Sequence, residues 1–261
     1  MSDPESVLLC EKNDGIATLT LNRPRQRNAL SLQLMSDLVD RLAEIAADDD
    51  VRVVVIRGNG PGFCAGHDLK EMRADPREAA HQKTFAKCVE LMTSIVKLPQ
   101  PVIARVHGIA TAAGCQLVAT CDLAVAADDA RFATPSVNIG LFCSTPMVAL
   151  SRNVGRKRAM EMLLTGDMID AATAHRFGLV NDVAQPDALD DAVQALAAKI
   201  SSKSPLTLRI GKEAFYRQLE TGIDDAYEYT GAVMVRNMLT DDAAEGIDAF
   251  IEKRQPVWKG S

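Results

Sequence analysis

The sequence predicts an α/β fold with a helical C-terminal region, and three observations support this. Short runs of β-branched residues, each followed by a glycine-containing loop and a helical stretch, recur up to about residue 145. Beyond that point the strand patterns nearly vanish. The 261 residues, 47% hydrophobic and 25% charged, can bury one large core. We therefore expect a single α/β core followed by a helical appendage.

The first predicted element is a β-hairpin. Residues 7–11 and the alternating residues 16–21 flank residues 13–15 (Asn-Asp-Gly), a run typical of a tight turn. Ser31 is a candidate N-cap of the helix that follows, and the acidic residues 48–50 end that helix. Apolar residues recur at helical spacing between these points: Leu34, Leu38, Leu42 and Ile45. The pattern predicts an amphipathic helix packed on a sheet.

Two strand, loop and helix cycles follow. Residues 51–56 are almost all β-branched, which predicts a strand buried on both faces. It leads into the glycine-rich loop 58–62 and a helix over about residues 76–98. The second cycle comprises a strand over residues 102–106, a loop at Gly108, a helix over residues 112–120 and a strand over residues 123–127.

The rest of the chain is predicted to be almost entirely helical. The expected helices cover residues 145–153, 156–164, 170–176, 186–201, 204–220, 223–238 and 241–252, with one short strand over residues 179–183. No repeat of solenoid length and no low-complexity linker interrupts them. Separately mobile modules are therefore not expected.

Composition and charge argue against several function classes. The formal net charge is −6, and the basic residues form no stripe, so nucleic acid is not the expected partner. The six cysteines show neither C-x-x-C pairing nor zinc-finger spacing, which predicts buried free thiols and no metal site. The short acidic N-terminus is not followed by a long apolar run. We therefore expect no signal peptide, no membrane partner and a cytoplasmic location.

One loop raises a dinucleotide-binding site as an alternative. Residues 60–65 (Gly-Pro-Gly-Phe-Cys-Ala) fit the G-x-G-x-x-A pattern after a strand. Such a site needs a second parallel strand that ends in an acidic residue about 20 residues on. Residues 77–83 are instead polar and helical in pattern, which argues against this site. The motifs of serine hydrolases, P-loop proteins and zinc proteases are also missing.

Two other loops predict chemistry carried by the backbone. Residues 63–69 and 108–114 each follow a predicted buried strand, are rich in glycine and alanine, and lead into a helix. Such loops can direct free backbone N–H groups at one point, and the start of the helix behind them adds positive potential. These loops are therefore candidates for stabilising a negative charge.

The order of motifs along nearly the whole chain resembles the crotonase (enoyl-CoA hydratase/isomerase) family. The central motif is residues 63–72 (FCAGHDLKEM), followed by residues 101–108 (PVIARVHG), 112–117 and 121–123. Further matching segments are residues 22–24, 28–30, 135–140, 164–166, 178–180 and 250–254. The resemblance implies a crotonase-like spiral of ββα units in residues 1–200, with an acyl-CoA site, and helices for trimerisation in residues 201–261.

The resemblance also implies the activity and its participants. The substrate would be an acyl-CoA thioester of fatty acid metabolism, with coenzyme A as part of the substrate and no separate cofactor. The assembly would be a homotrimer or a dimer of trimers. An oxyanion hole made by the backbone N–H groups of His67 and Ala113 would polarise the thioester carbonyl. The implied CoA contacts are Arg25, Ala29, Ala65, Asp68 and Leu69, with Phe250 and Lys253 from a neighbouring subunit. For Arg25 and Lys253 an ordinary solvated charge is the alternative.

The sequence departs from the family at the positions of its catalytic glutamate pair, which map onto Gln116 and Ser136. An amide can hold a water molecule but cannot take its proton, and a serine is a poor base, so efficient hydration of a 2-enoyl-CoA is not expected. Other groups that could take part are the His67 side chain, Cys143, Ser144 and Thr145. Structural roles explain two further polar residues without chemistry: His107 and Asp122.

Two functions remain open from the sequence. In the first, an enzyme holds the thioester between the His67 and Ala113 amides and catalyses isomerisation, thioester hydrolysis, proton transfer or weak hydration. The intact pair of loops favours this function. In the second, the protein binds acyl-CoA without turnover, and the absence of glutamate at both catalytic positions favours it.

Overall fold

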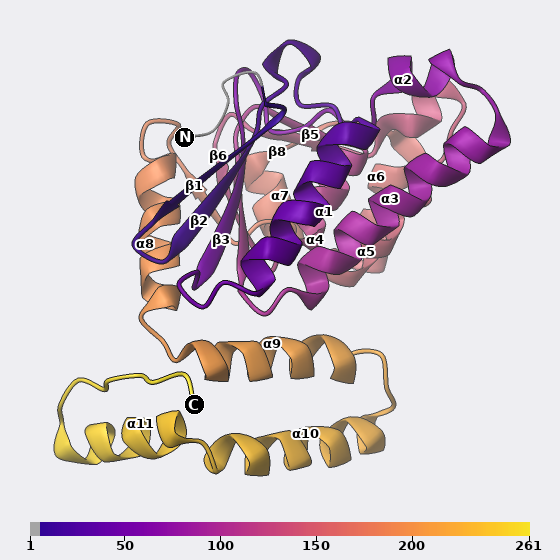
Figure 1. Ribbon diagram of the computed structural model, residues 1–261. Helices are drawn as coiled ribbons and strands as arrows, with labels where there is room; N and C mark the ends of the chain where they lie inside the picture. Colours follow the sequence, from indigo (N-terminus) through magenta and orange to yellow (C-terminus); the bar gives the residue numbers. More distant parts are fainter. Residues whose placement is uncertain (1–5) are drawn as a thin grey trace.

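The computed structural model describes residues 6–261, and its centre is a six-stranded sheet of order β1-β2-β3-β4-β6-β9 (Figure 1). The strands are β1 Leu8–Asn13, β2 Ile16–Leu21, β3 Val53–Gly58, β4 Val102–Val106, β6 Leu123–Ala127 and β9 Asp182–Ala184. The first two form the predicted antiparallel hairpin, and every later neighbour pairs in parallel. The carboxyl ends of the parallel strands therefore open at one edge, where the two predicted loops meet.

A smaller sheet lies beyond this edge and was not predicted. Its order is β5-β7-β8, with β5 Ile109–Thr111, β7 Arg131–Ala133 and β8 Ile169–Asp170. The sequence patterns also missed the short helix α2, Leu69–Ala74. Strands of two or three residues are too short to show an alternating pattern, so tertiary pairing alone defines them.

Helices cover both faces of the large sheet (Figure 1). On one face lie α1, Leu32–Ala46, and α3, Glu78–Lys97, whereas α8, Leu189–Ser201, packs on the other. Alternate residues of β3 enter the two sides: Val54 and Ile56 join the larger apolar cluster, and Val53 and Val55 join the smaller one under α8. The prediction of a strand buried on both faces is confirmed.

The predicted cap of the first helix is also confirmed. Ser31 has extended backbone angles, and its Oγ accepts a hydrogen bond of 3.2 Å from Leu34 N. This bond satisfies one of the backbone N–H groups that every helix leaves free at its start. The helix then buries the predicted apolar residues Leu34, Leu38, Leu42 and Ile45.

The remaining helices agree with the predicted ones, α4 with the helix of the second cycle and α5 to α7 and α9 to α11 with the C-terminal pattern. They are α4 Ala113–Thr120, α5 Pro146–Asn153, α6 Arg156–Thr165, α7 Ala171–Phe177, α9 Pro205–Gln218, α10 Ile223–Met238 and α11 Asp241–Glu252, with 3₁₀ turns η1 Pro24–Gln26 and η2 Pro135–Ile139. Figure 1 shows α9, α10 and α11 set apart from the sheet as a C-terminal arm. Many of their apolar side chains are exposed, among them Leu239 at 82% and Phe250 at 85%. Within residues 6–261, no helix has the length and apolar character needed to cross a bilayer.

Asp122 joins the C-terminal arm to the core. Its carboxylate accepts hydrogen bonds from Val102 N (2.7 Å), Lys212 Nζ (2.6 Å) and the Tyr216 hydroxyl (2.8 Å). Lys212 also donates to the carbonyl oxygens of Ile95 and Gln100, at 3.1 and 3.0 Å, so its three protons all have partners. Burial lowers the pKa of Lys212 against the opposing attraction of Asp122. The structural role predicted for Asp122 thus extends to anchoring α9.

Candidate active site

Two loops at the carboxyl edge of the sheet pair with each other. Cys64 N donates to Ile109 O at 3.0 Å, and Thr111 N donates back to Cys64 O at 2.9 Å. A glycine permits this approach, because a Cβ atom added at Gly114 would lie 2.1 Å from Cys64 O. A side chain at that position is therefore excluded by backbone atoms rather than by flexible groups.

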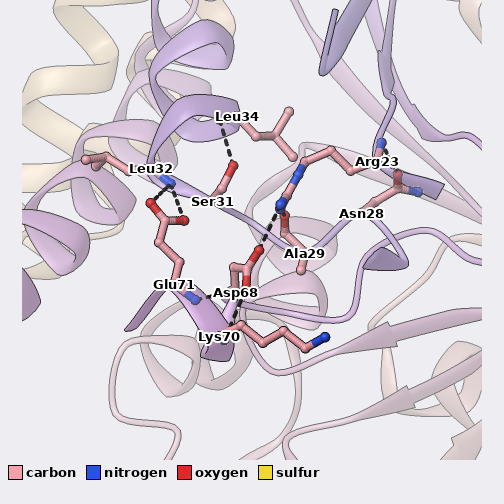
Figure 2. Close-up of polar contacts among 9 residues, drawn as sticks. All are labelled: Arg23, Asn28, Ala29, Ser31, Leu32, Leu34, Asp68, Lys70 and Glu71. Atoms are coloured by element: carbon pink, nitrogen blue, oxygen red, sulfur yellow. Dashed lines mark hydrogen bonds and ion pairs between the residues drawn. The ribbon is translucent and has the colours of Figure 1, made fainter. Parts of the chain in front are cut away.

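Gly66 brings the backbone of His67 to the start of α4. It has φ +97°, and a Cβ atom added there would lie 2.9 Å from Ala112 Cβ and 3.3 Å from Ala113 N. Within residues 6–261, neither His67 N nor Ala113 N donates a hydrogen bond to another residue. The structure thus places two free backbone N–H groups in neighbouring segments. Figure 2 shows the loop that carries Asp68 and Lys70, directly after His67.

Ala112, which precedes the second of these N–H groups, has a rarely occupied backbone conformation. Its φ of 51° and ψ of −118° are unusual for a residue with a side chain. Ala112 N donates to Ala133 O at 2.9 Å, which ties this turn to β7. The next residue, Ala113, begins the fully buried helix α4, so its free N–H lies where the helix dipole is positive. Both features suit an anionic oxygen.

A cavity of about 550 Å³ opens beside these two segments. Its lining residues are Ala65, His67, Leu69, Met72, Phe85, Ala112, Pro135, Ser136, Asn138, Ile139, Leu141, Phe142, Cys143, Ser144, Thr145 and Pro146. This lining contains no aspartate, glutamate, lysine or arginine. Apart from Ala65 and Leu69, the sequence did not single out its apolar members, since an apolar side chain in a cavity wall has the same sequence pattern as one in the core. The cavity suits an uncharged, largely apolar group.

Ser136, one of the two predicted catalytic positions, lies in the cavity wall. Cys143 Sγ donates to Ser136 Oγ at 2.9 Å, so two of the candidate groups form a pair. The other predicted position, Gln116, lies elsewhere. It is 5% exposed on α4, does not line the cavity, and its Oε1 accepts a weak hydrogen bond from Cys88 Sγ at 3.8 Å. The structure therefore does not bring Gln116 and Ser136 together in one wall.

The His67 side chain is packed rather than solvated. Its ring meets the ring of Phe85 edge-on, with centroids 5.5 Å apart, and neither ring nitrogen has a hydrogen-bond partner among the described residues. Burial lowers the pKa of His67, with the nearby Leu30 backbone opposing the shift. The imidazole is therefore neutral at pH 7.

Asp68 holds the loop after His67 in place (Figure 2). Its carboxylate forms an ion pair of 2.8 Å with Arg23 and caps α2 by accepting from Lys70 N and Glu71 N. Glu71 in turn accepts from Leu32 N, at the start of α1. Burial opposes ionisation of Asp68, but the bonds from Arg23 and the Glu71 backbone outweigh it and lower the pKa of the carboxyl. These contacts occupy the carboxylate that the resemblance assigned to CoA.

The other predicted CoA contacts are divided between two regions. Ala65 and Leu69 line the cavity, and Arg25 is exposed on η1. Ala29 is buried, and its carbonyl oxygen accepts from Arg23 Nη1. Phe250 and Lys253 lie at the end of the C-terminal arm and do not line the cavity of their own chain. Figure 1 places α11 far from α2, which begins at Leu69.

His107 and the buried cysteines have structural roles. The guanidinium of Arg105 can only donate, so His107 Nδ1 accepts from it at 2.9 Å and Nε2 donates to Gly60 O at 2.8 Å. This agrees with the structural role predicted for His107. Burial raises the pKa of Cys64 and Cys115 to about 12, which leaves both thiols protonated at neutral pH.

Comparison with known proteins identifies the family. The family model for enoyl-CoA hydratase/isomerase matches residues 11–261. Enoyl-CoA hydratase domain-containing protein 3 from Xenopus laevis is 48% identical, over 99% of this chain and 87% of its own length. The crystal structure of an enoyl-CoA hydratase from Mycobacterium smegmatis has a TM-score of 0.96 at 55% identity, with 97% of this chain and 99% of that chain covered. The crystal structure of human enoyl-CoA hydratase domain-containing protein 3 has a TM-score of 0.94 at 45% identity, covering 97% of this chain and 100% of that chain.

These relatives contradict the predicted cytoplasmic location. The similar domain-containing proteins 3 from Xenopus laevis, Rattus norvegicus and Homo sapiens are all named mitochondrial, and this finding overturns the predicted cytoplasmic location. The prediction used only the lack of an apolar N-terminal run. Such a run marks secretory and membrane proteins, so its absence does not distinguish the cytoplasm from the mitochondrion.

The fold, the paired loops and these matches lead to one conclusion. The likeness predicted from the motif order is confirmed over nearly the whole chain, including the crotonase fold. The chain belongs to the enoyl-CoA hydratase/isomerase (crotonase) family.

Proposed function

We propose that this protein binds an acyl-CoA thioester, with the thioester oxygen between the backbone N–H groups of His67 and Ala113. Two observations support this proposal. A Cβ atom added at Gly66 would lie only 2.9 Å from Ala112 Cβ and 3.3 Å from Ala113 N, and neither N–H group is bonded within residues 6–261. The thioester oxygen would gain negative charge as an enolate or a tetrahedral intermediate forms. Fixed backbone donors at the start of α4 stabilise such a charge without reorganisation.

The reaction is one that needs no carboxylate in the acyl cavity. Ordinary hydration of a 2-enoyl-CoA requires a general base for the attacking water, and the described lining offers neither aspartate nor glutamate. We therefore propose thioester polarisation with slow hydration. Isomerisation or thioester hydrolysis would need a proton acceptor other than a carboxylate, for which the lining offers His67, Cys143, Ser144 and Thr145. The same charge-free lining supports a second candidate function, in which the protein holds acyl-CoA without turnover.

Assembly would complete the CoA site. Phe250 is 85% exposed and Lys253 is exposed at the end of α11, remote from the cavity of the same chain (Figure 1). We propose that they reach the CoA moiety in a neighbouring subunit of a trimer or a dimer of trimers. Arg25, Ala65 and Leu69 would contact the CoA from the first subunit. Asp68 would act there by fixing the loop through Arg23.

Turnover of crotonyl-CoA in ¹⁸O-labelled water tests this proposal. Mass spectrometry of all CoA products, with a hydratase that carries both glutamates as reference, separates the outcomes. Label in free crotonate with little labelled 3-hydroxybutyryl-CoA is expected for thioester hydrolysis. Labelled 3-hydroxybutyryl-CoA at the rate of the reference enzyme would contradict slow hydration. Binding without any product would favour the second candidate function.

The pair of substitutions Gln116→Glu and Ser136→Glu tests the assignment of the catalytic positions. If residue 116 reaches the thioester as the family resemblance implies, the two substitutions together should raise the rate of hydration by about 10²-fold or more, because they would supply the missing acid and base. Ser136→Glu alone, in the cavity wall, should give part of that gain. A double variant that folds and binds crotonyl-CoA but gains nothing would contradict the assignment.

A further inference from the structure

The two walls of the acyl cavity differ in chemistry. One wall comes from residues 65–85 and Ala112 and is apolar, since the ring nitrogens of His67 are buried away from the surface. The other wall is the continuous segment of residues 135–146. It contributes five neutral side chains capable of hydrogen bonding: Ser136, Asn138, Cys143, Ser144 and Thr145. An acyl chain here meets hydrocarbon on one side. On the other side it meets these hydrogen-bonding groups together with five apolar residues: Pro135, Ile139, Leu141, Phe142 and Pro146.

The hydroxyl proton of Ser136 is available for a hydrogen bond to a ligand. Cys143 Sγ donates to its Oγ at 2.9 Å, and the Ser136 proton itself is donated to no residue between 6 and 261. The side chains of Asn138 and Thr145 also have no hydrogen-bond partner within the described chain. A saturated acyl chain packed against this wall would displace water from these groups without replacing the hydrogen bonds that the water made. An oxygen atom on the chain would replace the lost water.

The same wall excludes a charged acyl group. No lysine or arginine lines the cavity that could pair with a carboxylate, and no acid lines it that could pair with an ammonium group. An ionised substituent would therefore lose its hydration without gaining a partner. The wall therefore favours an acyl group that carries an uncharged oxygen able to accept hydrogen bonds.

We infer that the acyl group held in this cavity is uncharged and carries an oxygen acceptor, such as a ketone oxygen, on the edge that faces Ser136. This inference rests on the proposed acyl-CoA function and specifies its substrate class. Ser136 is the residue that determines specificity, as the donor to the acyl oxygen. Cys143 donates to the oxygen of the Ser136 hydroxyl, so the hydroxyl proton remains available to the ligand.

Calorimetric titration of the full chain with matched CoA esters tests the inference. The four-carbon set is butyryl-CoA, acetoacetyl-CoA and succinyl-CoA, and a six-carbon pair is hexanoyl-CoA and 5-oxohexanoyl-CoA. At least one oxo ester should bind about fivefold more tightly than its saturated partner, the gain typical of one hydrogen bond. Succinyl-CoA should bind more weakly than butyryl-CoA.

The variant Ser136→Ala should abolish the preference for the oxo ester, by weakening the affinity for that ester relative to the affinity for butyryl-CoA. Met72→Leu, on the apolar wall, is the matched control and should keep the preference. Equal affinities in both pairs, or a preference that survives in Ser136→Ala, would overturn the inference and leave acyl-CoA binding established. Failure of every ester to bind would overturn the proposed function as well.

Discussion

The Asp122 junction and the cavity lined by His67 and Ser136 both hold polar groups in apolar surroundings, but they pair these groups in opposite ways. At the junction, the carboxylate of Asp122 and all three protons of Lys212 have partners. At the cavity, the N–H groups of His67 and Ala113 and the proton of Ser136 have none in the described chain. Full pairing makes a structural joint, whereas unused hydrogen-bonding capacity is what a ligand can exploit.

Breaking the junction should produce the largest loss of stability. In Asp122→Ala, Lys212 keeps a charge that is mostly buried without an acid, and Val102 N and Tyr216 lose their acceptor. We expect the free energy of unfolding to fall by about 3 kcal/mol, measured by chemical denaturation at fixed protein concentration. The double variant Asp122→Ala with Lys212→Met should recover part of this loss, because no charge is then left unpaired. A single variant as stable as the wild type would refute the structural role.

Adding a side chain between the His67 and Ala113 segments should reduce acyl-CoA turnover more strongly than it reduces the free energy of unfolding. Gly66→Ala places a Cβ atom 2.9 Å from Ala112 Cβ and 3.0 Å from Thr111 O, at a φ of +97°. The His67 and Ala113 segments must then move apart, and we expect acyl-CoA turnover to fall by about 10²-fold, the usual effect of losing one oxyanion donor. If the protein only binds, affinity for acyl-CoA should fall instead. Gly211→Ala, where no atom lies within 4 Å, is the control and should behave as wild type.

Acidification should lower the free energy of unfolding through His67, whose ring nitrogens have no partner in the described residues. Burial lowers the pKa of His67 in the folded protein, so between that pKa and the ordinary value near 6.5 the unfolded chain binds more protons. The stabilisation is complete above about pH 6.5 and is lost as the pH falls through the folded pKa, with a slope of at most about 1.4 kcal/mol per pH unit. His67→Phe keeps a ring against Phe85 and should flatten this part of the stability profile between pH 7 and 5. An unchanged profile would show that His67 does not titrate as expected.

The smallest expected effect is a gain in stability at Ala112. Its positive φ is strained for alanine, and Ala112→Gly should relieve that strain and raise the free energy of unfolding by about 0.5–1 kcal/mol. Because the backbone N–H of Ala113 stays in place, acyl-CoA affinity should not change. Thermal unfolding and ligand titration of the same preparation check both points. A loss of affinity would mean that the alanine methyl group contacts the ligand.

The sequence predicted most of the large sheet and nearly all of the long helices because these elements repeat a pattern over many residues. The turn at Asp14 and Gly15, the cap at Ser31 and the two-sided burial of β3 all follow from local chemistry. The strands β5, β7 and β8 could not be found in this way, since they are stabilised by pairing between segments far apart in the chain.

The features of the candidate site also fall into those that the sequence determined and those that only the tertiary structure decided. The sequence by itself determined the two glycine-containing loops, the family and the absence of glutamate at residues 116 and 136, because motif order and residue identity are properties of the chain alone. Tertiary structure alone decided which side chains face the cavity. It turned Ser136 toward Cys143 in the cavity wall and Gln116 toward Cys88 in the interior, and it packed His67 against Phe85. The physical reason is that the direction of a side chain depends on how distant segments pack, which no local pattern records.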